Sequence, residues 1–292
     1  MTRASSRQIR TQGRSASARN SPSATKDQVE GVVAWLERNG SKRTRDGMAR
    51  YAIPSDKAFG VPVGALKRHA KQLGRDHELA MALWETGWYE ARMIAAFLGE
   101  PARLTAAEMD RWCRDFDNWA ICDHACFHFF DRSPHAWRKV VAWSGRRGEF
   151  QKRAAFALLA SLALHDKEAA DEKFLRCLPL IERAAIDDRN FVKKGVSWAL
   201  RLIGRRSLGL NDAALTLSRR LAPSSEAAAM WIGKGAVKEL SSHFSTNSAV
   251  CLRAFSRTRG TFSLARMVTS EVMDRFRFSW ASVVLRWPFL TS

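Results

Sequence analysis

Apolar residues recur at helical spacing from residue 27 to about residue 242, and this pattern limits the fold more than any other feature of the chain. Val29, Val32 and Leu36 begin the pattern, and their spacing of three and four residues places them on one face of a helix. Similar segments follow one another, and no strand pattern of comparable strength interrupts them. The sequence therefore predicts an all-α fold.

The helical segments are short and are joined by short loops. Series of this kind, without alternating strands, are typical of an α-solenoid, in which antiparallel helical pairs stack and leave a long concave face. Thr105 and Glu108 have the spacing of a capping box, and Asn190 and Asn211 suit N-caps. The predicted helices cover residues 27–39, 42–49, 62–74, 76–86, 88–98, 105–115, 117–130, 134–144, 149–165, 168–186, 190–204, 211–221 and 225–241.

Composition divides the chain into three parts. Residues 1–26 contain six basic residues, no acidic residue and almost no large apolar side chain, so we expect a disordered basic arm. Its composition also resembles an organelle transit peptide, although no clear amphipathic helix is present. We expect the folded domain over residues 27–242. The helical rhythm fails over residues 243–292, where we expect a weakly ordered basic extension.

The chain carries 48 Lys and Arg against 29 Asp and Glu, a formal charge of +19. Without its two terminal parts, a charge of +8 remains on residues 27–242. A basic domain of this size favours an anionic partner, and nucleic acid is the leading class. The most apolar candidate for a membrane span, residues 280–290, is too short and is interrupted by Arg286 and Pro288. Five cysteines without framework spacing indicate a reducing, intracellular setting without disulfides.

The segment 117–128 has the highest density of reactive side chains. Cys122, Cys126, His124 and His128 are the residue types that bind zinc. However, the two cysteines and the two histidines lie roughly 200° apart around a continuous helix, so the four cannot close on one ion. The alternative is that the cysteines pack in the core and the histidines are partly exposed.

Trp119 and Asp123 share a face of the same helix. An aromatic plane beside a carboxylate suits a cationic ligand or a developing positive charge. Further along, Lys194, Trp198 and Arg201 fall on one helical stripe. From spacing alone, both groups are also compatible with an ordinary half-buried Trp and a solvated charged face.

Four motifs in order resemble bacterial DNA alkylation repair enzymes of the AlkD type, which are glycosylases built from HEAT-like helical repeats. They are Phe-Gly-Val-Pro at residues 59–62 before a basic helix, Asn118-Trp119 followed by Asp123, Lys-Arg-Ala-Ala at residues 152–155, and residues 191–201 with Lys193, Lys194 and Trp198. The resemblance covers about residues 30–242 and neither terminal part.

The resemblance implies a glycosylase that removes cationic N3- and N7-alkylated purines from duplex DNA. It assigns Asp123 as the catalytic carboxylate, with Trp119 and Trp198 beside the deoxyribose of the lesion. We expect no cofactor and no metal, a monomer, no membrane association, and a bacterial cytoplasmic location at the nucleoid. The cations expected to bind the DNA backbone are Lys67, Lys71, Arg153, Lys193, Lys194 and Arg201.

The chemistry fits these residue types. A cationic base is already an activated leaving group, so the sugar that acquires oxocarbenium character is what must be stabilised. Asp123 can supply the negative charge and orient water, while two indole faces attract positive charge and exclude solvent. One rival is a non-catalytic helical-repeat scaffold that binds nucleic acid. The other is a protein-interaction module, which the charge of +8 disfavours.

Overall fold

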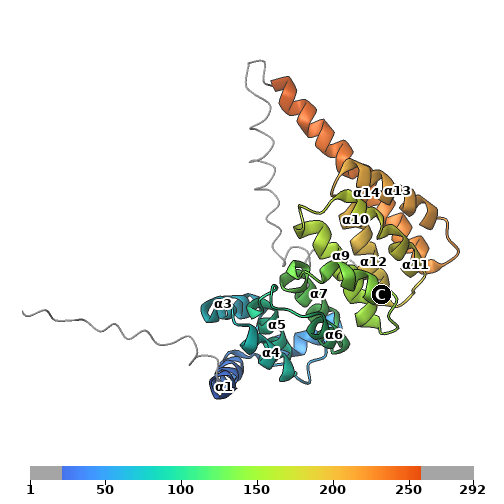
Figure 1. Ribbon diagram of the computed structural model, residues 1–292. Coiled ribbons are helices and arrows are strands. Elements are labelled where there is room, and N and C mark those ends of the chain that lie inside the picture. Colours follow the sequence, from blue (N-terminus) through green and yellow to red (C-terminus); the bar gives the residue numbers. More distant parts are fainter. Residues whose placement is uncertain (1–21, 258–292) are drawn as a thin grey trace, which may run out of the picture. The chain divides into compact units, whose positions relative to one another are not determined.

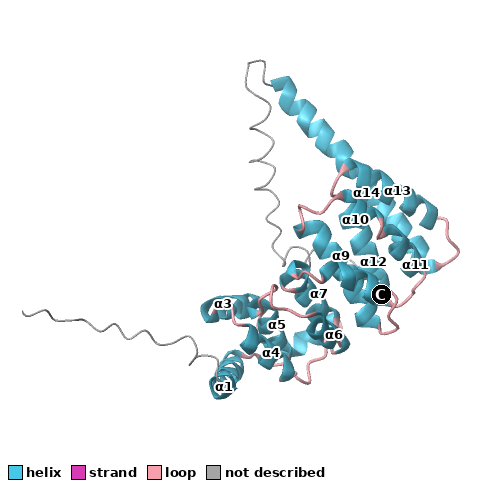
Figure 2. Cartoon of the chain, viewed as in Figure 1, coloured by secondary structure: helices cyan, strands magenta, loops and turns pink. Residues whose placement is uncertain are grey.

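A computed structural model describes the backbone of residues 22–257 and the side chains of residues 23–242. All regular structure in the described residues is helical (Figures 1 and 2). None of the described helices is long and apolar enough to cross a membrane. The elements are α1 (Pro22–Asn39), α2 (Lys42–Gly47), η2 (Met48–Tyr51), α3 (Val63–Leu73), α4 (His77–Glu85), α5 (Tyr89–Leu98), α6 (Ala106–Arg114), α7 (Trp119–His128), η3 (Phe130–Arg132), α8 (Ala136–Ser144), α9 (Glu149–His165), α10 (Asp171–Leu175), α11 (Leu178–Ala184), α12 (Asn190–Gly204), α13 (Leu208–Leu221) and α14 (Ala227–Arg257).

The chain divides into two compact units between Val237 and Lys238. In the first unit, α3, α5, α7, α9 and α12 form a row in which each helix packs against the next. Helices α4, α8 and α13 form a second layer, packed on α5, α9 and α12 respectively. Alternation between two layers is the arrangement of stacked helical pairs, as the sequence predicts. The second unit contains the C-terminal part of α14.

Local sequence explains where several helices begin. Thr105 and Glu108 form the predicted capping box at α6, and Asn118 caps α7 by accepting a hydrogen bond from the Ile121 amide at 3.0 Å. Two other predicted caps are wrong. Asn190 is the first residue of α12, and the buried side chain of Asn211 lies inside α13 and donates to the Gly204 carbonyl at 2.9 Å.

Several predicted helix boundaries also differ from the structure. Residues 168–186 form two short helices because Pro179 lies in the first turn of α11, where its missing N–H group is tolerated. α1 begins at Pro22, within the predicted arm. α14 continues to Arg257, although the sequence predicts that helical rhythm fails after Ser242. Residues 1–21 and 258–292, which hold the rest of the two predicted terminal parts, lie outside the described residues.

The Phe-Gly-Val-Pro motif has a structural role before α3. The amides of Phe59, Gly60 and Val61 all donate to the buried Glu90 carboxylate, at 3.0, 2.7 and 3.2 Å. Gly60 has a φ of +84°, and a Cβ there would lie 2.2 Å from the Ser41 carbonyl oxygen. Only glycine fits this turn, which fixes the direction in which the basic helix α3 leaves α2 and η2.

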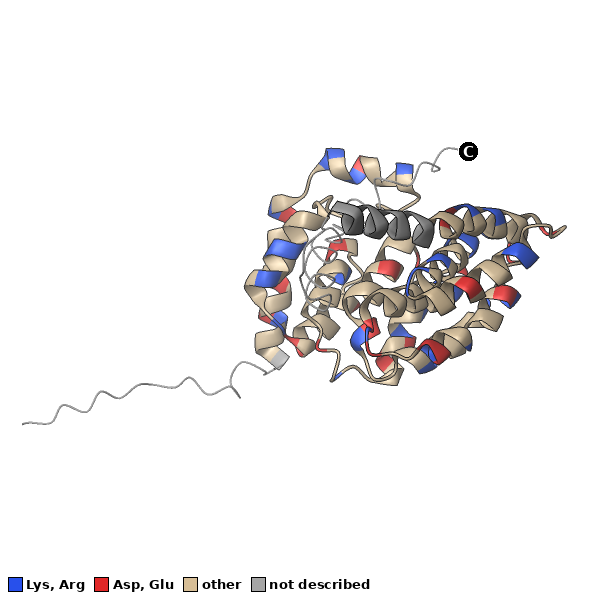
Figure 3. Ribbon diagram, turned by 90° about the horizontal axis from the view of Figure 1, so that it is seen from above, with Lys and Arg blue, Asp and Glu red and all other residues tan. Residues whose placement is uncertain are grey.

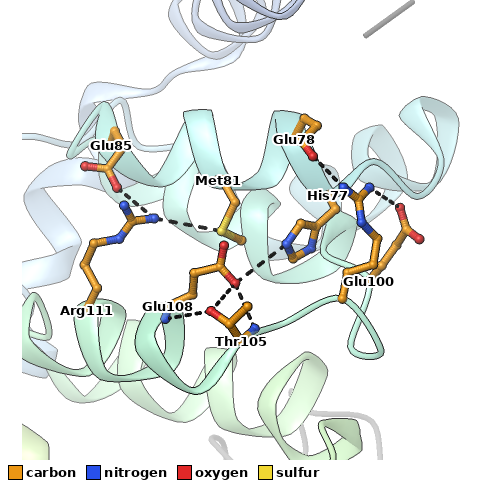
Figure 4. Close-up of polar contacts among 9 residues, drawn as sticks. His77, Glu78, Met81, Glu85, Glu100, Thr105, Glu108 and Arg111 are labelled. Atoms are coloured by element: carbon orange, nitrogen blue, oxygen red, sulfur yellow. Dashed lines mark hydrogen bonds and ion pairs between the residues drawn. The ribbon is translucent and has the colours of Figure 1, made fainter. Parts of the chain in front are cut away.

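Polar bridges connect neighbouring helices around an aromatic core. Indole N–H groups donate across the repeats, from Trp84 to Asp115 at 2.8 Å and from Trp143 to Asp110 at 2.8 Å. A network of ion pairs and the capping box joins α4 to α6 and the loop before it (Figure 4). Such bridges fix the register between helices whose apolar contacts alone are not directional.

Candidate nucleic-acid interface

The Asp123 carboxylate and the Arg153 guanidinium form a bidentate ion pair between α7 and α9. Arg153 Nε donates to Asp123 Oδ1 at 2.8 Å, and Nη2 donates to Oδ2 at 2.7 Å. The two side chains are only 3% and 1% exposed. Arg153 Nη1 donates to the Phe191 carbonyl at 2.8 Å, which extends the network to α12.

This geometry differs from the role that the resemblance implies for Arg153. A cation that holds the DNA backbone has to offer donors at the surface, but Nε, Nη1 and Nη2 of Arg153 all bind inside the protein. Local spacing could not reveal this, because the partner is thirty residues away. In this structure Arg153 orients Asp123. Gly195 of α12 lies beside Arg153, and a Cβ there would be at van der Waals distance, 3.4 Å, from Arg153 Cγ.

Two opposing effects act on the Asp123 carboxyl. Burial raises its pKa, because desolvation penalises the charged form, and the Arg153 guanidinium opposes the rise. A carboxylate that lies so deep keeps its charge only beside a cation with matching fork geometry. The pair therefore holds the Asp123 carboxylate in one orientation in a water-poor setting, where electrostatic interactions are strong.

Aromatic side chains lie on both sides of Asp123 along α7. Trp119 is one turn before it, and Phe127 is one turn after it. The Trp119 indole donates from Nε1 to the Tyr51 carbonyl at 2.7 Å and is mostly buried. The Trp198 ring of α12 stacks on Phe127, with centroids 4.7 Å apart and planes inclined by 3°. Three consecutive helices of the row thus bring together all four of Trp119, Asp123, Arg153 and Trp198.

The other predicted DNA-binding cations fall into two groups. Lys67 and Lys71 are exposed and one turn apart on α3. Burial, and next the charge of Lys67, lower the pKa of the His128 imidazole on α7. Lys193, Lys194 and Arg201 are partly exposed on α12.

Contacts within the protein orient the α12 cations. Lys193 Nζ lies 5.6 Å from the centre of the Trp231 ring, and Arg201 Nε donates to the Ser197 carbonyl at 3.1 Å. The pKa of Lys194 is lowered first by burial and then by the charge of Arg153. Figure 3 shows basic residues on many helices, with acidic residues among them. Charge density alone therefore does not mark one DNA-binding surface, and we select candidate DNA-binding cations by their position relative to α7.

The cysteines and histidines of α7 are used in packing. The Sγ atoms of Cys122 and Cys126 contact the carbonyl oxygens of Phe150 and Ala154, each at 3.6 Å. His124 Nε2 lies 2.9 Å from the Met93 carbonyl oxygen. In the part of the chain that the structure describes, no three His, Cys, Asp or Glu side chains converge as metal ligands do.

The structure adds three residues to those found in the sequence. Phe127 and Asp131 continue the four-residue spacing that begins with Trp119 and Asp123, and His165 of α9 lies against both. The sequence signal for Phe127 and Asp131 is their spacing of four residues from Asp123 and from each other. His165 gave no such signal, because its two contacts are more than thirty residues away in the chain.

The fold and the clustered side chains define a helical-repeat protein whose candidate site lies on three consecutive helices of one row. The model of a family described as DNA alkylation repair enzyme matches residues 32–232, more than half of the chain. The chain therefore belongs to the DNA alkylation repair enzyme family, and the resemblance found in the sequence is confirmed.

A solved structure supports the fold assignment. It is described as "A new family of proteins related to the HEAT-like repeat DNA glycosylases with affinity for branched DNA structures". The match has a TM-score of 0.59 and 22% identity, and it covers 65% of this chain and 82% of the other. At this identity the likeness concerns the fold, and it confirms the predicted HEAT-like repeats. No curated protein sequence matches the chain.

Proposed function

We propose that this protein is a monomeric DNA glycosylase that hydrolyses the N-glycosidic bond of cationic N3- and N7-alkylated purines in duplex DNA. The observation that carries the proposal is the Asp123–Arg153 pair on the same stripe as Trp119 and Phe127, with Trp198 stacked at its end. Membership of a DNA alkylation repair enzyme family supports it. The domain charge of +8 supports DNA as the partner, and we propose that binding occurs at a concave face of the repeats.

In the proposed reaction, the bond between the base nitrogen and C1′ breaks, and the electron pair leaves with the purine. The cationic base departs neutral, so no general acid is required. The charge of Asp123 stabilises the positive charge that develops on the sugar, and the oxygen of a water molecule then bonds to C1′ while its proton passes to solvent. Arg153 acts as a positioning residue, because it holds the carboxylate ionised and in one orientation.

A second candidate function is binding of DNA junctions without base excision. The observation in its favour is that both oxygens of Asp123 accept hydrogen bonds from Arg153 and that the carboxylate is 3% exposed. The solved structure with the similar fold is described as having affinity for branched DNA. In this alternative the ion pair is purely structural, and the cations of α3 and α12 bind phosphates.

Base release from duplex DNA containing 7-methylguanine separates the two functions. Under single-turnover conditions with protein in excess, the glycosylase proposal predicts release by the unaltered protein. Asp123→Asn should slow release by a factor on the order of 10² or more, which corresponds to at least about 2.7 kcal/mol of transition-state stabilisation. Asp212→Asn on α13 is the matched control, because Asp212 is exposed and lies in the second layer.

The outcomes are distinct. Equal release by Asp123→Asn and the unaltered protein refutes the assigned role of Asp123. If the unaltered protein releases no base and binds a four-way junction more tightly than a linear duplex of equal length, the second candidate is correct. The assay temperature has to lie well below the melting temperature of each variant, because Asp123 also contributes to stability.

A further inference from the structure

Asp131 of η3 and His165 of α9 form a second polar pair, in which a buried carboxylate contacts a partly exposed imidazole. His165 Nδ1 lies 2.5 Å from Asp131 Oδ2, and Ser161 Oγ donates to the same oxygen at 2.6 Å. The Asp131 side chain is fully buried, whereas that of His165 is 37% exposed. Because a carboxylate only accepts hydrogen bonds, Nδ1 of His165 carries the proton, and Nε2 is the ring nitrogen left for a ligand.

Asp131 is arranged to hold positive charge on that imidazole. Its other oxygen, Oδ1, is buried and has no hydrogen-bond partner among the described side chains. A buried carboxylate with so few donors is stabilised most by a cation at contact distance. The pair is therefore suited to a protonated His165 whose Nε2–H group points away from Asp131.

The same residues do not form a hydrolytic triad. In a triad the histidine lies between the carboxylate and the serine, but here both Ser161 and His165 contact the carboxylate. Ser161 is also fully buried. A substrate cannot reach its hydroxyl, so nucleophilic catalysis is excluded for this serine.

His165 opens on a depression with two further cations. The depression has a volume of about 500 Å³ and is lined by Asp131, Arg132, Leu164, His165, Asp166 and Lys167. Arg132 and Lys167 are both exposed. The carboxylate of Asp166 is already used, because it accepts from the Trp137 indole at 3.1 Å and from the Ala169 amide at 3.0 Å. The lining therefore offers donors and cations to an anion.

The loop that forms one wall is held in place. Arg206 donates to the carbonyl oxygens of Ala163, Lys167 and Ala169, at 3.3, 3.1 and 2.7 Å. Its guanidinium also lies 4.5 Å from the centre of the Phe174 ring. The depression is thus preorganised before a ligand arrives, which lowers the entropic cost of binding.

Position connects the depression to the candidate site. The His165 ring lies 5.6 Å from the Phe127 ring, edge to face, and Phe127 in turn stacks on Trp198. Asp131 lies in η3, which follows α7 directly in the chain. The Phe127 ring therefore links His165, at the depression, to Trp198 of the candidate site.

We propose that His165, Arg132 and Lys167 form a binding site for one DNA backbone phosphate, and that binding requires a protonated His165. The proposal rests on the proposed function only in taking DNA as the ligand. His165 Nε2–H donates to a phosphate oxygen, and Asp131 offsets the imidazolium charge from behind. Binding then takes up a proton, so affinity rises as pH falls.

Two other imidazoles lie on α7, near His165, and both have lowered pKa values. Burial, and next the charge of Lys67, lower the pKa of His128 on α7 to about 4, and burial lowers the pKa of His124 well below its ordinary value. Both imidazoles are therefore neutral above about pH 6. The charged groups that line the depression with His165 are Asp131 and Arg132 of η3, and Asp166 and Lys167 of the loop after α9. Arg206, in the loop after α12, binds carbonyl oxygens of the loop after α9. Trp137 of α8, which binds Asp166, carries no charge.

The test is the affinity of the full chain for an undamaged duplex oligonucleotide, measured by fluorescence anisotropy between about pH 6 and about pH 8. We expect affinity on the order of tenfold higher at the lower pH, the value of one charge-assisted hydrogen bond. His165→Asn keeps an N–H group toward Asp131 and should reduce this ratio to about twofold or less. His135→Asn, at the start of α8 and outside the depression, should retain the full ratio.

Salt dependence tests the two neighbouring cations. Arg132→Gln and Lys167→Gln should each reduce the slope of log affinity against log salt concentration by about 0.9. Arg138→Gln on α8 is the control, since Arg138 is exposed and outside the depression. The proposal is overturned if His165→Asn, shown by circular dichroism to be folded, has the same ratio of affinities between the lower and the higher pH as the unaltered protein. Unchanged slopes in both cation variants overturn it too.

Base release distinguishes this proposal from the glycosylase function. If the protein releases no 7-methylguanine but loses its pH-dependent affinity in His165→Asn, the phosphate site stands and the glycosylase proposal fails. If the protein releases base and His165→Asn binds with the full pH ratio, the reverse holds. If the unaltered protein binds no DNA across this pH range, both proposals fail.

Discussion

Removing one partner of the Asp123–Arg153 pair should destabilise the whole repeat domain. Arg153→Met leaves the Asp123 carboxylate buried without its two charge-assisted hydrogen bonds, and it also leaves the Phe191 carbonyl without a donor. Breaking a buried ion pair in this way costs about 3–5 kcal/mol. In a domain of this size, each kcal/mol lowers Tm by roughly 2–4 °C. The expected decrease in Tm is therefore on the order of 6–20 °C.

The loss should depend on pH in a defined direction. Burial raises the pKa of Asp123, and without the guanidinium nothing opposes the rise. A carboxyl with a higher pKa in the folded than in the unfolded protein destabilises the fold above the folded pKa, and the penalty disappears as pH falls. The stability difference between Arg153→Met and the unaltered protein should therefore shrink between about pH 7 and about pH 5.

Urea unfolding followed by circular dichroism measures these free energies, with Arg153→Met, Asp123→Asn and the double variant as a cycle. The double variant carries no buried charge, so it should cost less than the two single variants together, by roughly 1–3 kcal/mol. The difference in unfolding free energy between the double variant and the unaltered protein should also be independent of pH between about pH 7 and about pH 5. If Arg153→Met costs less than about 1 kcal/mol at neutral pH, the pair is solvent-exposed and the reasoning is refuted.

Three further predictions concern the frame around the site. Asn118→Ala removes the cap of α7 and should cost about 1 kcal/mol of unfolding free energy in urea. Phe127→Ala should cost about 3–5 kcal/mol and should increase quenching of Trp198 by acrylamide, because the stacked ring is lost. The pKa of Asp187 is lowered, mainly by its hydrogen bond with Arg189, so its stabilising effect is present above about pH 4 and lost as pH falls. Asp187→Asn should therefore give a shallower loss of stability in acid, and an equal loss contradicts the assignment.

The sequence predicts best the elements with an unbroken apolar period. The predicted bounds of α9 and α12 agree with the structure at both ends, since each has a continuous helical pattern. The sequence predicts one helix over residues 168–186, whereas the structure has α10 and α11 there, with Pro179 in the first turn of α11. Local pattern predicts which residues share a face of one helix, but not which helix lies opposite.

In the candidate site, too, the sequence predicts contacts within one helix but not contacts between helices. Trp119 and Asp123 could be paired from a spacing of four residues within α7. Burial of Arg153, by contrast, depends on contacts to residues thirty and thirty-eight positions away. A surface arginine and a buried partner of a carboxylate have the same local sequence, so only the packing of α9 between α7 and α12 separates them.

Trp119, Asp123 and Phe127 follow one another at intervals of four residues on α7, and this makes the helix sensitive to a change in length. Inserting or deleting a single residue within α7 rotates the later side chains of that helix by about 100° around its axis. The Asp123–Arg153 pair and the stack of Phe127 on Trp198 would then lose their alignment with Trp119. Family members that keep this site should therefore vary in length between the helical pairs, for instance over residues 185–189, and hold residues 119–128 free of insertions.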